Sequence, residues 1–169
     1  NGVLFPRRIR GKYAMLSRPS DTGHTPFGDI FYSESPDLCR WGCHRHVMAP
    51  KRLTWQSTKV GAGPTPIETG EGWLVIYHGV RQNAAGSIYR LGVALFDLHA
   101  PEICLKRGDE WIFGPEEPYE RRGDVDNVVF PCGYTIAVDG DTIYLYYGAA
   151  DTSIALATGS IQSILEWLE

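Results

Sequence analysis

A strand–loop–strand pattern occurs three times along this 169-residue chain and limits the folds open to it. In each copy an apolar run ends in a polar or aromatic residue, a loop follows, and a second apolar run begins. The first runs end at Arg18, His78 and Tyr147, which recur at intervals of 60 and 69 residues. These intervals are too long for one hairpin and suit one four-stranded blade of a β-propeller. The pattern predicts an all-β chain with three blade-like repeats.

Composition agrees with the all-β class. The chain has 19 glycines, 11 prolines, 5 tryptophans and 9 tyrosines, which favour turns and aromatic-rich strands. No segment resembles a linker, so residues 1–169 are predicted to form a single partial β-propeller domain. A short C-terminal helix is expected because Ser163 and Glu166 have the spacing of a capping box, next to an apolar helical face.

Local patterns predict where individual strands begin and end. Residues 1–12 are expected to be an irregular lead-in, and residues 81–86 a polar connection. Two separate strands are expected at 128–130 and 134–138. Residues 139–141 read Asp-Gly-Asp between two apolar runs, which predicts a hairpin turn because glycine adopts positive φ without steric cost.

Charge and cysteine content argue against several classes of protein. A net charge of −4 without a basic stripe is unlike a nucleic-acid-binding domain. The longest apolar runs fall far below the ~18 residues of a membrane-spanning helix, so no membrane partner is expected. Four cysteines are too few for a disulfide-stapled secreted module, which favours a reducing compartment and hence the cytoplasm.

Polar strand ends form the main candidate site. The inner strands of a propeller end at a common axial hollow, so Arg18, His78 and Asp151 are expected to meet there. Lys59 adds a cation in a glycine-rich segment, whose backbone is expected to approach a ligand closely. Arginine, lysine and a protonated or suitably tautomeric histidine together bind an oxyanion. The residues alone leave an alternative, in which Arg18 and Lys59 are solvated strand ends and His78 is a hydrogen-bonded core residue.

Two further motifs resemble a zinc site and a nucleotide-binding loop, but the sequence argues against both. Cys39, Cys43, His44 and His46 are zinc-ligand types, but alternate residues of a strand face opposite sides. Four ligands within eight residues also surround a tetrahedral ion poorly, so no metal site is expected. Gly61-Ala-Gly63 lacks the Gly-Lys-Ser/Thr of a nucleotide-binding loop.

Several segments, taken in series, resemble one known family. They resemble glycoside hydrolase family 130, the β-mannoside phosphorylases and related hydrolases, over nearly the whole chain. The most specific segments are Tyr77-His-Gly-Val80, Val128-Val-Phe-Pro-Cys-Gly133 and Tyr147-Gly-Ala-Ala-Asp-Thr152.

The resemblance implies a five-bladed β-propeller whose axial pocket binds a β-mannoside beside inorganic phosphate, with no other cofactor. Phosphate attacks the anomeric carbon with inversion, an aspartic acid protonates the leaving oxygen, and mannose 1-phosphate is released. The family positions that hold phosphate correspond to Arg18, Lys59, His78 and Tyr89. A position that hydrogen-bonds the sugar corresponds to Asp151. Family members that use water tend to lack such basic ligands, so the resemblance favours phosphorolysis.

The chain also departs from the family pattern. The family's proton-donor aspartate belongs to an N-terminal half that this chain does not contain, so no catalytic residue is assigned. Asp21, Asp29 and Asp124 stand at no matching motif. Three repeats cannot close a propeller ring, so self-association or pairing with the missing half is expected. Two alternatives stay open: a noncatalytic carbohydrate- or anion-binding module, and a subunit that completes a ring with a second chain.

Overall fold

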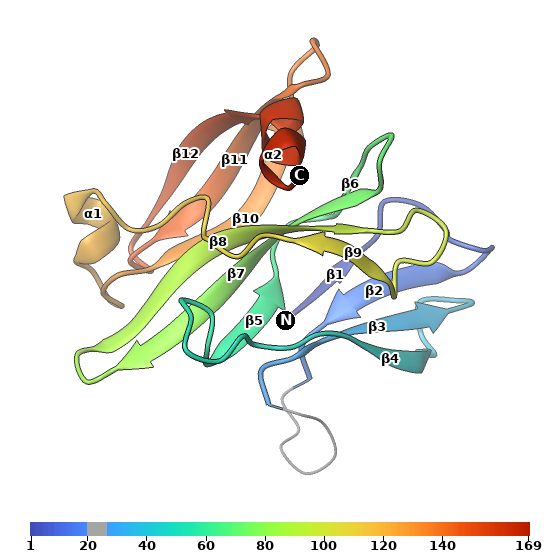
Figure 1. Ribbon diagram of the computed structural model, residues 1–169, viewed down its shortest axis with the longest axis horizontal. Helices are drawn as coiled ribbons and strands as arrows, with labels where there is room; N and C mark the ends of the chain where they lie inside the picture. Colours follow the sequence, from blue (N-terminus) through green and yellow to red (C-terminus); the bar gives the residue numbers. More distant parts are fainter. Residues whose placement is uncertain (20–26) are drawn as a thin grey trace.

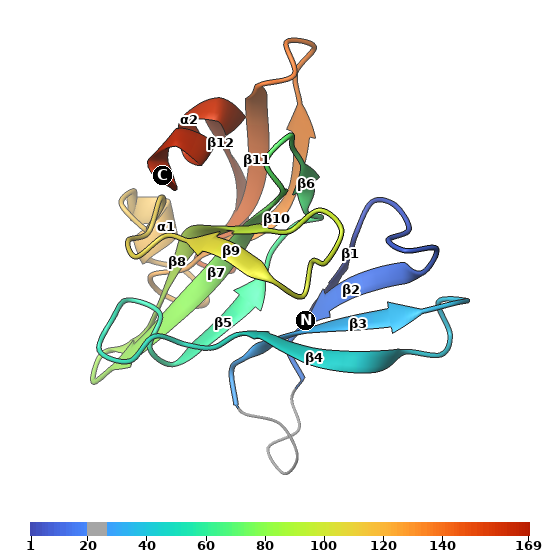
Figure 2. The ribbon, with the colours of Figure 1, turned by 45° about the vertical axis from the view of Figure 1, so that its right-hand side comes forward.

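The computed structural model describes residues 1–19 and 27–169. The described residues form twelve β-strands and two short helices, arranged as three antiparallel sheets. In both views of the ribbon, the central sheet lies between the N-terminal and the C-terminal sheet (Figures 1 and 2). The mostly-β class and the short C-terminal helix are therefore confirmed. The three sheets do not join into a closed ring within the described part of the chain.

The N-terminal sheet begins earlier than the sequence predicted. Residues 2–4 form a strand that pairs with residues 15–17, so the prediction of an irregular lead-in is wrong there. This pairing continues into Phe5, whose backbone N–H donates to the Ala14 carbonyl and whose ring is buried in the core. In order across the sheet the strands are β1 (Gly2–Leu4), β2 (Tyr13–Ser17), β3 (Ile30–Ser35) and β4 (Gly42–Met48).

The central sheet is built on one long hairpin. Residues 81–83, predicted as a connection, continue the strand up to a two-residue turn. The prediction is wrong because backbone pairing needs no apolar side chains, and these polar residues are exposed at the end of the hairpin. The strands are β5 (Lys59–Ala62), β7 (Trp73–Asn83), β8 (Gly86–Phe96) and β9 (Cys104–Arg107) in order, with β6 (Ile67–Glu68) paired to β7.

The C-terminal sheet contains one strand where the sequence predicted two. Its register shifts between Pro131 and Gly133, and this irregularity lets a single strand pass through a proline. The turn predicted at residues 139–141 is confirmed, with Gly140 at φ 75°. The strands in order are β10 (Val129–Ile136), β11 (Thr142–Ala149) and β12 (Ser153–Ser160).

Both helices are short. The predicted C-terminal helix is α2 (Ile161–Trp167), but its cap is Ser160, whose Oγ accepts from the Ser163 N–H at 3.0 Å. The expected Ser163–Glu166 box was placed one turn too late. Helix α1 (Pro118–Arg121) was not predicted, although a proline at its first position is a recognised start signal. Neither helix in the described residues has the length and apolar character that a membrane crossing demands.

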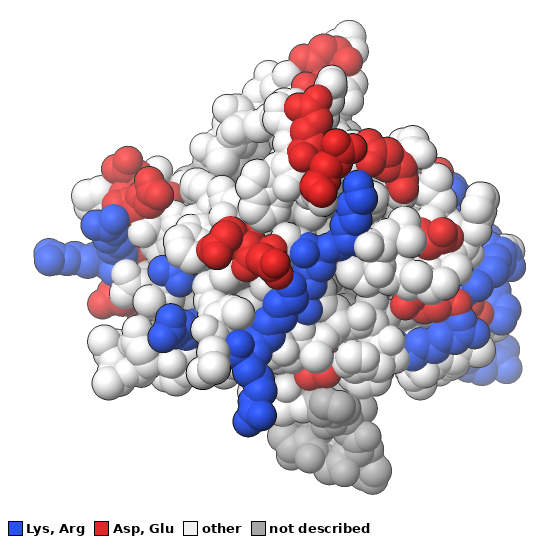
Figure 3. Space-filling model, viewed as in Figure 1, with Lys and Arg blue, Asp and Glu red and all other residues white. Residues whose placement is uncertain are grey.

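Two hydrophobic cores lie on the two faces of the central sheet. Side chains alternate along a strand, so neighbours in β7 enter different cores. Tyr77 packs toward the N-terminal sheet with Tyr32, whereas Ile76 packs toward the C-terminal sheet with Leu145. On the surface, acidic and basic side chains lie next to one another and neither sign covers the face shown in Figure 3.

Candidate functional site

Arg18 and His78 meet beside the middle of β7, so His78 is not the strand end that the sequence predicted. Arg18 follows β2 directly, and His78 lies within β7. The Arg18 Nη1 is 2.9 Å from the His78 Nε2 and also donates to the Val60 carbonyl at 3.3 Å. A guanidinium only donates hydrogen bonds, so Nε2 of His78 accepts and the ring proton lies on Nδ1. The predicted convergence of these two residues is confirmed.

His78 is held in its neutral form. Its side chain is fully buried, and this burial, followed by the charges of Arg18 and Lys59, lowers its pKa to about 3. Of the two forms that the sequence allowed, the structure selects the neutral tautomer. The Nδ1 atom finds no hydrogen-bond partner among the described residues. A buried polar group without a hydrogen-bond partner lowers stability by about 1–3 kcal/mol. A ligand whose acceptor formed a hydrogen bond to Nδ1 would remove this penalty and so bind more tightly.

Lys59 and Tyr89 lie close to Arg18 and His78. Both lie opposite Val80, Lys59 from β5 and Tyr89 from β8, so three neighbouring strands present them side by side. The Lys59 Nζ is 5.3 Å from the Tyr89 ring centroid, and the Tyr89 and His78 ring centroids are 5.9 Å apart. These two residues form one continuous group with Arg18 and His78, the basic cluster (Arg18, Lys59, His78 and Tyr89).

Gly61 permits the close approach of Arg18 and His78. A Cβ atom at this position would lie 2.5 Å from Cε1 of His78 and 2.7 Å from Nη1 of Arg18. The sequence interpretation was that glycine here lets the backbone approach a ligand. The structure shows that the absence of a side chain at Gly61 instead makes room for the side chains of Arg18 and His78.

The sequence predicts that the basic cluster binds phosphate, and Gly61→Ala is expected to weaken that binding at least tenfold, because its methyl group must push Arg18 or His78 out of place. Gly70→Ala is the matched control, since a Cβ there meets nothing within 4 Å. Isothermal titration calorimetry with phosphate, beside thermal unfolding, measures both effects. Equal phosphate affinity in the parent and Gly61→Ala would contradict the requirement for glycine.

Asp151 lies beside the basic cluster and not within it. It occupies the β11–β12 turn at φ 52° and is exposed. With Tyr89 and Phe130 it lines a hollow of about 310 Å³. The Phe130 and His78 ring centroids are 4.6 Å apart, so this hollow adjoins the basic cluster. Phe130 lies in the Val128–Gly133 segment that resembles the family, but neither spacing nor charge indicated a role for its ring.

Tyr147, the third repeated strand end, does not join the cluster. Its side chain is nearly buried, and its hydroxyl donates to Oε1 of Glu120 at 2.6 Å. Burial and this hydrogen bond raise the pKa of Tyr147 well above its usual value. Strand β11 continues two residues past Tyr147 to Ala149, so the end of this strand lies nearer to Asp151. Tyr147 therefore stabilises the fold around α1.

The other aspartates considered from the sequence have different surroundings. Asp29 is nearly buried and pairs with His46 at 2.6 Å. Asp124 is exposed in the loop after α1. Asp21 lies outside the described residues.

The two histidines of the zinc-ligand-like motif form hydrogen bonds with other side chains. His44 Nδ1 is 2.8 Å from the Ser33 hydroxyl, while His46 pairs with Asp29. In residues 1–19 and 27–169, no three side chains of histidine, cysteine, aspartate or glutamate are grouped to hold a metal ion.

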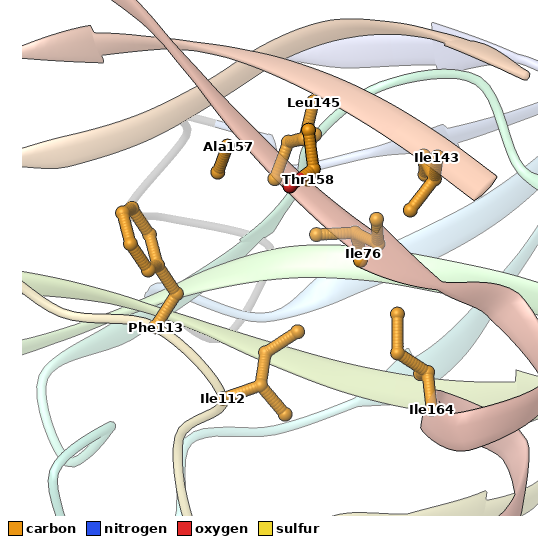
Figure 4. Close-up of a pocket in the computed structure, with 9 residues that line it drawn as sticks. Ile76, Ile112, Phe113, Ile143, Leu145, Ala157, Thr158 and Ile164 are labelled. Atoms are coloured by element: carbon orange, nitrogen blue, oxygen red, sulfur yellow. The ribbon is translucent and has the colours of Figure 1, made fainter.

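Figure 4 shows a different, apolar hollow between the central sheet, the C-terminal sheet and α2. Its volume is about 180 Å³, and Ile76, Ile112 and Leu145 are among its lining residues. Its lining carries no charged side chain, so it provides no anchor for an anion.

Comparison with known proteins identifies the family. A family model described as beta-1,4-mannooligosaccharide phosphorylase matches residues 1–169. The chain belongs to glycoside hydrolase family 130. It is 49% identical over 169 residues to "Beta-1,4-mannooligosaccharide phosphorylase" of Ruminococcus albus, and it covers 50% of that protein.

This chain covers a similar share of other members of family 130. The chain is 43% identical to "Beta-1,2-mannobiose phosphorylase" of Listeria innocua and covers 45% of it. The solved structure of a Listeria innocua β-1,2-mannobiose phosphorylase, in complex with β-1,2-mannobiose, superposes with a TM-score of 0.91 at 42% identity. It matches 99% of this chain and 46% of that chain. This family 130 chain thus spans about half the length of the curated relatives it matches.

Proposed function

We propose that this chain supplies the phosphate-binding part, and some of the sugar-binding part, of a β-mannoside phosphorylase. The observation that carries the proposal is the basic cluster, in which a buried neutral His78 lies beside two cations and its Nδ1–H has no partner in the part of the chain that the structure describes. A tetrahedral anion is the ligand that suits such donors. The family membership and the adjoining hollow at Asp151 support a sugar as the second ligand.

In the proposed reaction, inorganic phosphate is the co-substrate and no other cofactor takes part. Arg18 and Lys59 offset the charge of phosphate, while the Nδ1–H of His78 and the Tyr89 hydroxyl donate hydrogen bonds to it. A phosphate oxygen forms a bond to the anomeric carbon as the glycosidic bond breaks, with inversion. The leaving oxygen takes a proton from an acid outside this chain, and mannose 1-phosphate is released.

The sugar is expected to contact Asp151. An exposed carboxylate at the rim of the hollow accepts hydrogen bonds from sugar hydroxyls, so its proposed role is to orient the mannoside and not to act as the acid.

We further propose that residues 1–169 are one domain, which contributes three blades to a five-bladed propeller. The side-by-side arrangement of the three sheets and the coverage of half of each relative support this proposal. The remaining blades would come from an N-terminal half that pairs with this one. Location in the cytoplasm is also proposed, supported by the four cysteines, which are all free thiols.

The test of the proposed function is phosphate-dependent release of mannose 1-phosphate from β-1,4-mannobiose and β-1,2-mannobiose by the complete gene product that carries this chain. Release that needs phosphate supports the proposal, and the preferred disaccharide defines the linkage. Release of free mannose at the same rate with and without phosphate would instead indicate a hydrolase.

Asp151→Asn is expected to raise KM for the mannoside about tenfold, because a neutral acceptor replaces a charged one. Asparagine tolerates the positive φ at this position, so folding should be preserved. Asp124→Asn, a matched exposed change, should leave KM as it is. Initial rates against mannoside concentration give both values, and an unchanged KM in Asp151→Asn would remove the sugar-binding role.

A further inference from the structure

A second polar hollow lies where the β7–β8 hairpin meets the segments before β5 and after β9. Its volume is about 370 Å³, and its lining includes Arg81, Arg90, Trp55, Trp111, Asp109 and Glu110. The proposed reaction uses none of these residues.

This hollow is on the opposite face of the central sheet from the basic cluster. Tyr89 and Arg90 are consecutive in β8, so their side chains point to opposite faces. Tyr89 faces Phe130 and the C-terminal sheet, as Leu91 does two residues later. Arg90 instead lies opposite Gly79, over which Trp55 packs. The two sites are therefore back to back on one hairpin.

The two arginines of the hollow are not neutralised. Among the described residues, neither Arg81 nor Arg90 has a carboxylate within 4.0 Å, and Asp109 pairs with Lys51 instead. Burial, followed by the charge of Arg81, lowers the pKa of Arg90. Two positive charges that face the same partly enclosed space favour an anion between them.

Arg90 is held in place by stacking. Its guanidinium lies 4.3 Å from the ring centroid of Trp111. Stacking occupies the flat face of the guanidinium, and its N–H groups point outward in the plane, where they can donate to an anion. Trp55 packs edge-on against Trp111 and donates through Nε1 to the Asp109 carbonyl, which fixes this wall of the hollow.

The remaining lining suits hydroxyl groups. The carboxylates of Asp109 and Glu110 disfavour a bare anion close to them, but they accept hydrogen bonds from hydroxyls. Trp111 keeps 42% of its surface exposed, and an aromatic ring of this kind packs against the C–H face of a sugar. The lining therefore combines donors for an anionic group with acceptors for a polyol.

We propose that this hollow binds a sugar phosphate, with the phosphate on Arg81 and Arg90 and the sugar ring beside Trp111 and the carboxylates. The site does not depend on the proposed function. That reaction would nevertheless release a ligand of this class, so the product could occupy a second site.

Mannose 1-phosphate, inorganic phosphate and mannose are the probes, titrated calorimetrically into the complete gene product. The Arg81→Gln/Arg90→Gln variant is expected to lose one class of mannose 1-phosphate site, with affinity there reduced at least tenfold. Mannose 1-phosphate should bind this site more tightly than either other probe. Arg40→Gln removes the same charge from an exposed hairpin loop and should change neither class of site.

Unchanged mannose 1-phosphate binding in the double variant would overturn the proposal, and so would mannose binding as tightly as mannose 1-phosphate. Arg90 is partly buried, so the exposed single variant Arg81→Gln is tested as well, with thermal unfolding as the check on folding. It should weaken the same class of site, and full affinity in a folded Arg81→Gln protein would also overturn the assignment. Phosphorolysis is measured separately, so failure of the proposed function remains distinguishable.

Discussion

Arg18→Leu is expected to lower kcat/KM for phosphate-dependent cleavage of a β-mannoside by about 10²-fold. A charge-assisted hydrogen bond contributes roughly 1.5–3 kcal/mol, and each 1.36 kcal/mol corresponds to a factor of ten in rate. Leucine retains apolar bulk at this half-buried position but also removes the donor that fixes the His78 tautomer. Initial rates at varied phosphate concentration measure the effect, which should appear mainly in KM for phosphate.

Arg8→Leu is the matched control, because Arg8 is exposed and stacks on Tyr13. Its kcat/KM should equal that of the parent. His78→Phe retains the aromatic packing and is combined with Arg18→Leu in a double-mutant cycle. Since Arg18 and His78 are in contact, their effects should not add. An unchanged KM for phosphate in Arg18→Leu would show that phosphate binds elsewhere.

The isolated 169-residue chain is expected to show negligible phosphorolysis. Attack by phosphate also requires a proton for the leaving oxygen, and a positioned acid typically contributes ~10²–10⁴-fold. No candidate aspartate that the structure describes lies in the basic cluster, and Asp29 pairs with His46. The assay compares mannose 1-phosphate release by this chain and by the complete gene product under the same conditions.

Self-association of the isolated chain is expected together with this loss of activity. Strand β12 is an edge strand that exposes 77% of Ile154 and 52% of Leu156. Unpaired edges with apolar side chains promote pairing between chains. Light scattering measures the mass, and Ile154→Lys should shift it toward the monomer. A monomer with full turnover would show that the acid lies within this chain.

The repeat predicted that Arg18 and His78 approach each other, because equivalent positions of neighbouring blades lie near one axis. Tyr89 followed only from the resemblance to the family. The strand ends themselves were predicted wrongly, since they depend on where backbone pairing stops: β7 continues past His78 to Asn83, and β11 continues past Tyr147 to Ala149. Strand β1 was missed for a similar reason, because its pairing with β2 lies in backbone hydrogen bonds that side-chain patterns do not reveal.

The protonation state of His78 could not be predicted. Spacing gives no information on which ring nitrogen accepts, and the answer depends on the contact with Arg18. Burial, which is set by the stacking of Tyr89 and Phe130 around the ring, then determines the pKa. The requirement for Gly61 also arises only when two distant segments are packed together.

The two proposed ligand-binding parts differ in how much of each is built from a loop. The basic cluster stands on or beside paired strands, whereas Val125 and Val128 of the hollow at Asp151 belong to the loop between α1 and β10. Loops tolerate substitution better than paired strands do. Directed evolution toward new sugars should therefore randomise this loop and keep Gly61 fixed. Sugar specificity could then diverge while the phosphate chemistry is inherited unchanged.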